Sequence, residues 1–398
     1  MSSQVKNVGD LSGRSRDLVF AQGRARLEAL GLAIVTVLGA GRMGTAFCTP
    51  LLDRGHEIRL VGTHLDTAYI DALRATGVHP GLQHPLPPGP SYYQLEDLPT
   101  ALEGAEMLVL GVSSAGIPWA TRTLAGLLTQ PLPLISITKG LEWDGAAFRL
   151  LPDLVVDGLP ESVRREMHPV AVTGPCVAGE LIRRRDTCVA FTGRDADAIS
   201  AWADAAATPY YHIWQSTEFE GCEASAALKN AFAIGIGFAR GVLEKTGNQP
   251  VLSGELEGVA AHNYEAGVFA ESIAEMSRIA GFAGGDPATP YGLVGVGDLL
   301  VTLYARSVRF GRLLGLGLSA DEGLAEMAGV TLEGVAMIHT FAKALEVLDA
   351  NGLTRPDELP LMRHLVHVIN GGSVNIPFDR FFGGDTVTQE ATFTAPVA

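Results

Sequence analysis

The sequence is poor in lysine, cysteine and aromatic residues. Of its 29 basic residues only five are lysines, and aromatic side chains make up 7% of the 398 residues. Acidic residues outnumber basic ones, and the resulting net charge of −15 argues against nucleic acid as a partner. In so lysine-poor a chain, a lysine that stands among small or apolar neighbours needs a functional explanation.

The cysteines show neither a metal-binding nor a disulfide-framework spacing, so we expect reduced thiols in a cytoplasmic protein. They are Cys48, Cys176, Cys188 and Cys222. No apolar run reaches the roughly 18 to 20 residues of a membrane span, and residues 1–30 lack the apolar segment of a signal peptide. We expect no metal site, because His364 and His367 have no apparent third ligand and fit a helix better.

Short β-branched runs alternate with helical segments in the first half, which predicts a mainly parallel Rossmann-type sheet with helices on both faces. The second half has helical periodicity. We therefore expect an extension at 1–32, a dinucleotide-binding domain at 33–215, a helical substrate domain at 216–386 and a tail at 387–398. The predicted strands are Ile34–Leu38, Glu57–Val61, Met107–Val112, Leu134–Thr138, Val170–Thr173, Cys188–Thr192 and His212–Trp214.

The helical half is expected to begin with one long helix at Glu218–Lys245, followed by a loop or insertion at 248–262. Four prolines between residues 85 and 90 predict an irregular loop in the first half. The further helices expected are Tyr264–Gly281, Arg309–Gly315, Ser319–Ala328, Val335–Asn351 and Pro360–Asn370.

A glycine-rich turn joins the first predicted strand to an apolar helix. Its glycines stand at 39, 41 and 44 in the order Gly-x-Gly-x-x-Gly. The first permits a tight turn, the second lets the backbone approach a pyrophosphate, and the third lets helix and strand pack closely. We therefore predict a dinucleotide cofactor in contact with Gly39, Gly41, Arg42, Met43 and Gly44.

Two lysines stand where chemistry is expected. Lys139 follows a predicted strand, at the end where open α/β sheets bind ligands. Lys229 lies on the long predicted helix, and small residues surround it on its helical face. With little surface to pack its stem against, such a lysine can lose its water, which lowers its pKa and suits it to proton transfer.

Two further segments contain candidate ligand groups. The run Gly174-Pro-Cys176-Val-Ala178 follows a strand and predicts a rigid turn. Asp298 follows two glycines and begins an apolar helix, where its simplest role would be to cap that helix. Thr302 lies on the same side of that helix, and Arg306 could bind an anion with two hydrogen bonds.

Taken in order, these motifs resemble those of the soluble NAD(P)-dependent glycerol-3-phosphate dehydrogenases over residues 33–380. The matching pieces are GAGRMGTA, RGHEIRL, ITKGLE, GPCVAGE, EGCEASAALKN, GVGDLLVT and LEGV. The resemblance implies that Lys229 is the general acid/base and that Lys139 and Asp298 complete the catalytic group. It implies substrate contacts at Lys139, Gly174, Cys176, Asn230, Asp298, Thr302, Arg306 and Ser307, and cofactor contacts at Lys139, Ala178, Arg306 and Glu333.

Because the chain departs from the family pattern at several positions, the motifs alone do not determine its substrate. The family usually has a small polar residue where this chain has Cys176, and asparagine where this chain has Ser307. The family's Val-Pro-Ser is Val112-Ser113-Ser114 in this chain. One alternative is a related dehydrogenase of another polyol phosphate, sugar alcohol or hydroxy acid. A non-catalytic nucleotide sensor is a second alternative, although the proton-transfer lysine is present.

The second predicted strand ends without an acidic residue that could bind the ribose hydroxyls of NAD. Thr63 and His64 stand there instead, with Asp66 slightly beyond, and we expect His64 to contact the cofactor. This pattern slightly favours NADP, or use of both cofactors. We expect a small phosphorylated substrate as the partner, and the apolar helical half is compatible with a homodimer.

Overall fold

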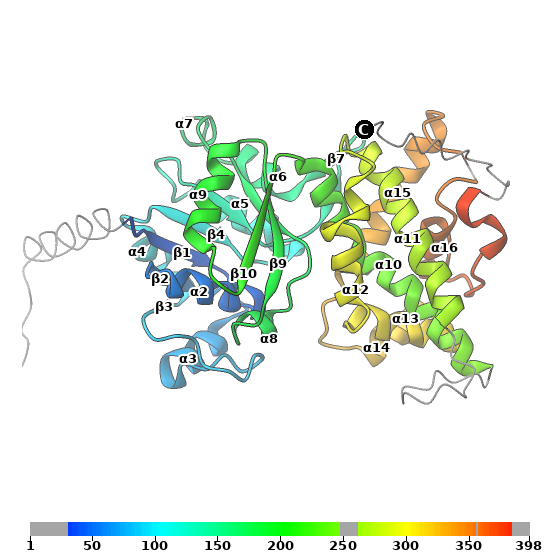
Figure 1. Cartoon of the computed structure of the whole chain (residues 1–398), viewed down its shortest axis with the longest axis horizontal. Coiled ribbons are helices and arrows are strands. Elements are labelled where there is room, and N and C mark those ends of the chain that lie inside the picture. The colour runs from blue at the N-terminus through cyan, green and yellow to red at the C-terminus, as the bar shows by residue number, and fades with distance from the viewer. Residues whose placement is uncertain (1–30, 247–261, 356, 384–398) are drawn as a thin grey trace, which may run out of the picture.

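The computed structural model describes residues 31–246, 262–355 and 357–383. It shows a sheet half and a helical half lying side by side (Figure 1). The N-terminal extension, the expected insertion and the C-terminal tail lie outside the described residues, apart from residues 31–32 and 262.

The sheet has eight strands in the order β10-β9-β8-β5-β4-β1-β2-β3 among the described residues. All neighbouring pairs are parallel except β8 with β9, so the prediction of a mainly parallel sheet is confirmed. The strands are β1 (Ile34–Leu38), β2 (Glu57–Val61), β3 (Ser91–Tyr93), β4 (Met107–Leu110), β5 (Leu134–Ser136), β8 (Val170–Thr173), β9 (Thr187–Thr192) and β10 (Tyr211–Ser216).

Helices cover both faces because successive buried side chains of a strand point to opposite sides. Val37 of β1 lies in the buried cluster that contains residues of α2 and α9, whereas its neighbour Leu38 lies in the cluster that contains residues of α5 and α6. The helices of this half are α2 (Arg42–Asp53), α3 (Thr67–Thr76), α4 (Leu98–Leu102), α5 (Ile117–Ala125), α6 (Leu151–Asp157), α7 (Glu161–Arg164), α8 (Ala178–Leu181) and α9 (Ala196–Ala206).

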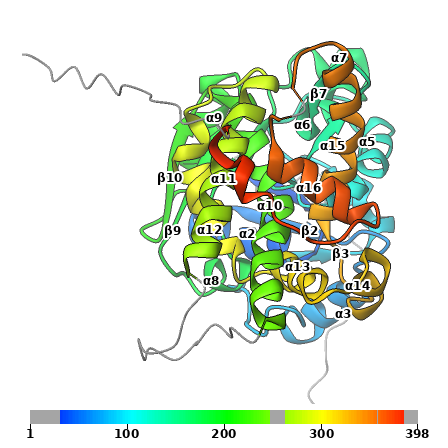
Figure 2. The same ribbon diagram turned by 90° about the vertical axis from the view of Figure 1, so that its right-hand side faces the viewer.

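Helix α10 (Phe219–Lys245) forms the centre of the helical half (Figure 2). Glycines let α13 approach it closely: a Cβ added to Gly311 would lie 2.0 Å from the Ile234 carbonyl oxygen. α10 is long and apolar enough to cross a membrane, but 72% of its apolar window is buried inside the fold. Around it lie α11 (His262–Phe282), α12 (Asp298–Thr302), α13 (Arg306–Leu316), α14 (Ala320–Glu326), α15 (Glu333–Ala350) and α16 (Pro360–Ile369).

Three elements differ from the sequence prediction. The proline-rich stretch expected to be irregular leads into β3, which pairs with β2 at the sheet edge, where prolines just outside the strand are tolerated. A hairpin of β6 (Leu141–Trp143) and β7 (Phe148–Leu150) follows Lys139. A π-helical turn at Leu293–Gly297 precedes Asp298.

Candidate active site

The glycine-rich turn between β1 and α2 has one open position and two crowded ones. A Cβ on Gly39 would lie 2.5 Å from the Gly111 oxygen, and one on Gly44 would lie 2.1 Å from the Gly39 oxygen. A Cβ on Gly41 would meet nothing within 4 Å. The turn lies where the strand order reverses between β1 and β4, the usual place for a dinucleotide. The cradle therefore fits a pyrophosphate, which would approach the backbone at Gly41 and the start of α2.

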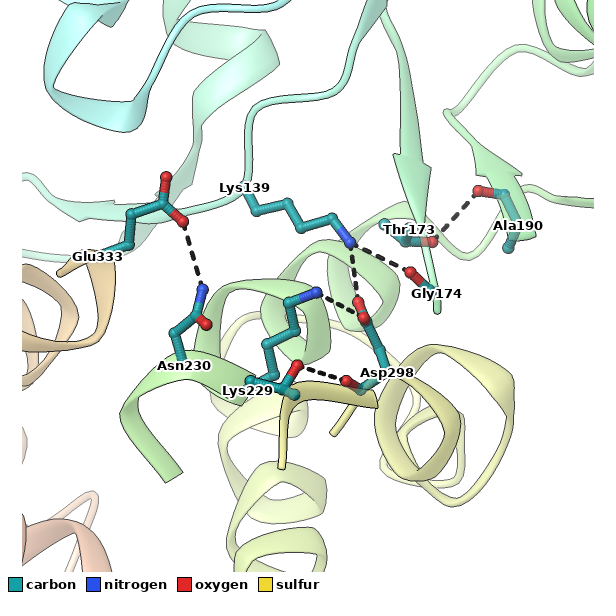
Figure 3. Close-up of polar contacts among 9 residues, drawn as sticks. Lys139, Thr173, Gly174, Ala190, Lys229, Asn230, Asp298 and Glu333 are labelled. Atoms are coloured by element: carbon teal, nitrogen blue, oxygen red, sulfur yellow. Dashed lines mark hydrogen bonds and ion pairs between the residues drawn. The ribbon is translucent and has the colours of Figure 1, made fainter. Parts of the chain in front are cut away.

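Two lysine ammonium groups converge on the carboxylate of Asp298 (Figure 3). Lys139 Nζ lies 2.8 Å from Oδ2 of Asp298, and Lys229 Nζ lies 2.5 Å from its Oδ1. Lys139 comes from the loop after β5 in the sheet half, while Lys229 on α10 and Asp298 on α12 come from the helical half. The cluster thus joins the two halves of the molecule.

Asp298 is fully buried, and its carboxylate accepts hydrogen bonds from the two lysines instead of capping a helix. Gly297 occupies the capping position of α12, so the simpler helix-cap interpretation of Asp298 is wrong. The lysine side chains are only 17% and 12% exposed for Lys139 and Lys229. A buried carboxylate between two ammonium groups satisfies its charge and holds both nitrogen atoms in place.

The two lysines differ in acidity. Burial lowers the pKa of Lys229 to about 8, with Asp298 opposing that shift and Lys139 adding to it. Burial also acts to lower the pKa of Lys139, but the charge and hydrogen bond of Asp298 outweigh it and the pKa lies above its usual value. Lys229 can therefore exchange a proton near neutral pH, whereas Lys139 remains a fixed positive charge.

A cavity of about 120 Å³ adjoins Lys139, between the loop after β5 and helices α10 and α15. Lys139, Asn230 and Glu333 line it together with residues of both halves. Asn230 Nδ2 donates to Glu333 Oε2 at 3.3 Å, so Asn230 is oriented towards α15 (Figure 3). A larger cavity of about 380 Å³ lies near Arg149 and Arg194, but both arginines are already paired with carboxylates.

Family models match both halves of the chain. Residues 34–198 match the N-terminal model of NAD-dependent glycerol-3-phosphate dehydrogenase, and residues 218–375 match its C-terminal model. The chain belongs to the NAD-dependent glycerol-3-phosphate dehydrogenase family. The resemblance seen in the sequence motifs is thereby confirmed.

Individual relatives agree with this assignment. The chain is 34% identical, over 74% of its length and 83% of the relative's, to the NADP(+)-dependent glycerol-3-phosphate dehydrogenase of Archaeoglobus fulgidus. It is 31% identical, over 85% of its length and 92% of the relative's, to the glycerol-3-phosphate dehydrogenase [NAD(P)+] of Halorhodospira halophila. The crystal structure of the Coxiella burnetii enzyme shares the fold, with a TM-score of 0.69 at 24% identity over 85% of this chain and 94% of that one.

The turn after β8 approaches the lysine cluster through its backbone. The carbonyl of Gly174 accepts a hydrogen bond from Lys139 Nζ at 3.2 Å, and its φ of +91° favours glycine. Burial raises the pKa of the Cys176 thiol to about 12, so this thiol stays protonated and is unsuited to act as a nucleophile. Ala178 begins α8 just beyond this turn.

The positions predicted to bind phosphate lie at the start of α13. Arg306 is its first residue, is exposed, and makes no ion pair with the described residues. Ser307 is buried and donates a long hydrogen bond of 3.5 Å to Asn230 Oδ1, so its hydroxyl supports Asn230. The Thr302 hydroxyl donates a hydrogen bond of 2.6 Å to the carbonyl of Asp298 within α12, so its proton is already engaged by the helix backbone.

Glu223 is a buried acid that the sequence analysis did not single out. Neither carboxylate oxygen has a hydrogen-bond partner among the described residues, and the side chain is 1% exposed. Burial raises its pKa to about 8, although the positive charge of Lys139 opposes that shift. Its position on α10, six residues before Lys229, was the only available signal, because a glutamate among Ala, Ser and Cys has no obvious surface role.

Proposed function

We propose that this chain catalyses the reversible NAD(P)H-dependent reduction of dihydroxyacetone phosphate to glycerol 3-phosphate. The observation that carries this proposal is the pair of lysine ammonium groups on Asp298, one of them with a pKa near 8. Family membership and the open cradle at Gly41 support the cofactor, and both relatives named above carry this activity in their names.

Lys229 is the proton donor in this proposal. When bound, NAD(P)H would supply the hydride that adds to the carbonyl carbon, which leaves the electron pair of the C=O bond on oxygen. Lys229 Nζ then gives that oxygen a proton and becomes a neutral amine, which regains a proton from solvent after the product leaves. In the reverse direction the neutral amine accepts the hydroxyl proton.

Lys139 and Asp298 hold the reacting groups in place. Lys139 keeps a permanent positive charge near the oxygen that becomes negative, which stabilises the transition state. Asp298 fixes both nitrogen atoms, because each of its oxygens accepts from one lysine. Their positions are set before the substrate arrives, so little reorganisation is needed during the reaction.

Arg306 is the proposed ligand of the substrate phosphate. It is exposed and unpaired among the described residues, and a guanidinium can bind phosphate through two hydrogen bonds. Gly174, Cys176, Asn230 and Ser307 are proposed as further parts of the substrate site. Met43, Ala178 and Glu333 are proposed to contact the cofactor.

The test is a comparison of Lys229→Ala with Lys245→Ala, which removes an exposed lysine at the far end of the same helix. Loss of a general acid costs about 10² to 10⁴ in rate, so we expect kcat to fall by that factor in the first variant only. NAD(P)H oxidation with dihydroxyacetone phosphate is the readout. Turnover of Lys229→Ala within threefold of wild type would eliminate the proposed role.

A substrate panel tests the alternative dehydrogenases. We expect dihydroxyacetone phosphate to be reduced with the highest kcat/KM, and Arg306→Ala to raise the KM for phosphorylated substrates far more than for dihydroxyacetone. An unphosphorylated hydroxy acid or sugar alcohol with a higher kcat/KM would replace the proposed substrate. Cofactor binding without turnover of any panel member would favour a nucleotide sensor.

The proposed setting is a homodimer in the cytoplasm. All four cysteines are free thiols, which supports a reducing compartment. Light scattering after size exclusion would measure the assembly directly, and a monomer at micromolar concentration would contradict the dimer. The proposed domains remain 33–215 for the cofactor and 216–386 for the substrate.

A further inference from the structure

Arg240 on α10 makes hydrogen bonds with all three of its guanidinium nitrogens. Its Nε donates to Glu265 Oε1 at 2.9 Å and its Nη2 donates to Glu265 Oε2 at 3.2 Å, which joins α10 to the neighbouring α11 (Figure 2). Its Nη1 donates to the backbone carbonyl of Leu303 at 3.0 Å. The Arg240 and Glu265 side chains are only 26% and 20% exposed. The ion pair therefore fixes the plane of the guanidinium, and the remaining edge of that plane holds a backbone group of a third segment.

Leu303 begins the short turn that joins α12 to α13. Asp298 is the first residue of α12 and Arg306 is the first residue of α13, so residues 303–305 connect the carboxylate of the lysine cluster to the proposed phosphate ligand. The Leu303 carbonyl lies just past the end of α12, where helix carbonyls lack partners within the helix. A positive side chain is a favourable partner at this end of a helix. Arg240 therefore satisfies a carbonyl that α12 itself leaves without a partner.

The turn between α12 and α13 contains few groups that could hold it in place. The Leu303 side chain packs partly against the helical core, but Tyr304 is 89% exposed. Ala305 occupies the capping position of α13 and has no side chain that could cap a helix. Among the described residues, the hydrogen bond that reaches this turn from another element comes from Arg240. The first turn of α13, which contains Arg306, therefore follows a backbone that Arg240 holds.

The body of α13 is fixed separately. A Cβ on Gly237 of α10 would lie 2.4 Å from the Val308 carbonyl oxygen, so the two helices touch through their backbones from Val308 onward. Arg306 precedes this contact, and its side chain is exposed. Loss of the Arg240 side chain should therefore loosen the start of α13 without separating the two helices.

We infer that Arg240 is a positioning residue for the substrate phosphate, because it holds the Leu303 carbonyl and thereby the backbone from which Arg306 reaches that phosphate. This inference rests on the proposed function and deepens it, since it adds to the phosphate end of the site a residue that acts through the backbone. A guanidinium must meet its anion at hydrogen-bond distance, and small displacements of a binding group weaken the substrate complex.

Arg240→Met, which keeps an unbranched side chain but none of its donors, tests this positioning. We expect the KM for dihydroxyacetone phosphate to rise about fivefold to tenfold while kcat stays within about twofold of wild type, because the same binding is lost from the ground state and the transition state. The KM for unphosphorylated dihydroxyacetone should stay unchanged. A merely structural role would lower the melting temperature or the amount of active enzyme, and neither change raises KM. An unchanged KM for dihydroxyacetone phosphate would overturn the inference.

Arg312→Met is the matched control. Arg312 on α13 makes the same kind of ion pair with α10, in which its Nε donates to Glu244 Oε2 at 2.6 Å and its Nη2 donates to Oε1 at 2.5 Å. Within the described part of the chain, its side-chain hydrogen bonds go to Glu244 and none goes to the turn. We expect this variant to lower the melting temperature as Arg240→Met does, and to leave KM within about twofold of wild type. An equal rise in KM would show that any loosening of α13 is sufficient, and the inference would be wrong.

Combining Arg240→Met with Arg306→Ala shows whether Arg240 acts through Arg306. If it does, adding Arg240→Met to Arg306→Ala changes the KM for dihydroxyacetone phosphate by less than about twofold. Effects that multiply would place the action of Arg240 elsewhere and contradict the inference. A large effect of Arg306→Ala beside no effect of Arg240→Met would remove the inference alone. An unchanged KM in Arg306→Ala would remove the proposed phosphate ligand and the inference together.

Discussion

The glycine-rich turn, the cofactor end of the proposed site, and the lysine cluster, its lysine end, are built in different ways. At the cofactor end, backbone atoms of the turn at residues 39–44 are proposed to bind the dinucleotide, and the side chains of Asp66 and His79 hydrogen-bond to Ala40 within that turn. The lysine end consists of three hydrogen-bonded side chains, of which Lys139 and Asp298 stand 159 residues apart in the chain. The first end is a local structure with remote supports, whereas the second exists only when both halves pack together.

Because of this difference, the two ends should lose their function on different kinds of substitution. A backbone cradle fails when a side chain intrudes on it, even though every charged group remains. A charge cluster fails when one partner is removed, even though the backbone is unchanged. Each end should therefore be sensitive to a different kind of substitution.

The largest expected effects on cofactor binding come from two alanine substitutions in the same glycine motif. Gly44→Ala brings a Cβ to 2.1 Å from the Gly39 oxygen, and such overpacking typically costs about 1–3 kcal/mol, so both the melting temperature and cofactor binding fall. Gly41→Ala meets no atom within 4 Å, so it melts like wild type but loses about 100-fold in cofactor affinity. Thermal melts and cofactor titrations measure both, and equal melting temperatures for the two variants would contradict this division.

Breaking the charge cluster should leave the cofactor end intact. Asp298→Asn leaves two buried ammonium groups without their carboxylate, and removing one partner of a buried ion pair typically costs about 3–5 kcal/mol. We expect kcat to fall about 100-fold or more, while the Kd for NADPH changes less than threefold. Asp204→Asn on the exposed side of α9 is the control. Unchanged kcat in Asp298→Asn would show that the cluster does not act in the reaction.

The acidity of Lys229 predicts opposite pH dependences for the two directions. Reduction needs the protonated amine, so its kcat falls about tenfold per unit as pH rises above about 8. Oxidation needs the neutral amine, so its kcat rises with pH until about 8 and then levels off. Initial rates in both directions from pH 6 to 10 provide the measurement. Parallel profiles in the two directions would assign the ionisation to another group.

The smallest expected effect on catalysis concerns Glu223, whose substitution should act on stability instead. In the unfolded chain its pKa is near the ordinary value of about 4.3, whereas burial raises the folded value to about 8. Between these values unfolding releases a proton, so rising pH destabilises the wild type, and the full penalty is reached above about 8. Glu223→Gln should therefore raise the melting temperature more at pH 8.5 than at pH 5.5. A difference between variant and wild type that does not depend on pH would contradict the raised pKa.

Local patterns predicted most of the fold. The glycine turn, the strand at Ile34–Leu38 and the long helix at α10 follow from periodicity and turn chemistry within a few residues. The β6–β7 hairpin was missed although Asp144-Gly145 is a turn signal, because each strand has only three residues. The pairing of β3 with β2 was missed because a short edge strand beside prolines lacks a periodic pattern.

The long-range contacts of the candidate site could not be predicted from the sequence. Lys139, Lys229 and Asp298 were each predicted from local context and family resemblance, but no local rule shows that both lysines bind one carboxylate. The sequence analysis placed Asp66 slightly beyond the end of the second strand and gave it no role, and only the structure shows its hydrogen bond to Ala40. Glu223 and His79 carry no motif at all, so their burial and partners had to come from the structure.

Chemical rescue of Lys229→Ala by small primary amines tests the central claim most directly. We expect alkylammonium ions to restore dihydroxyacetone phosphate reduction in a saturable way, with rates that vary with the pKa of the added amine. Wild type and Lys245→Ala should show no such gain. An impaired Lys229→Ala variant that no amine restores, beside full activity in Lys245→Ala, would contradict proton donation by Lys229.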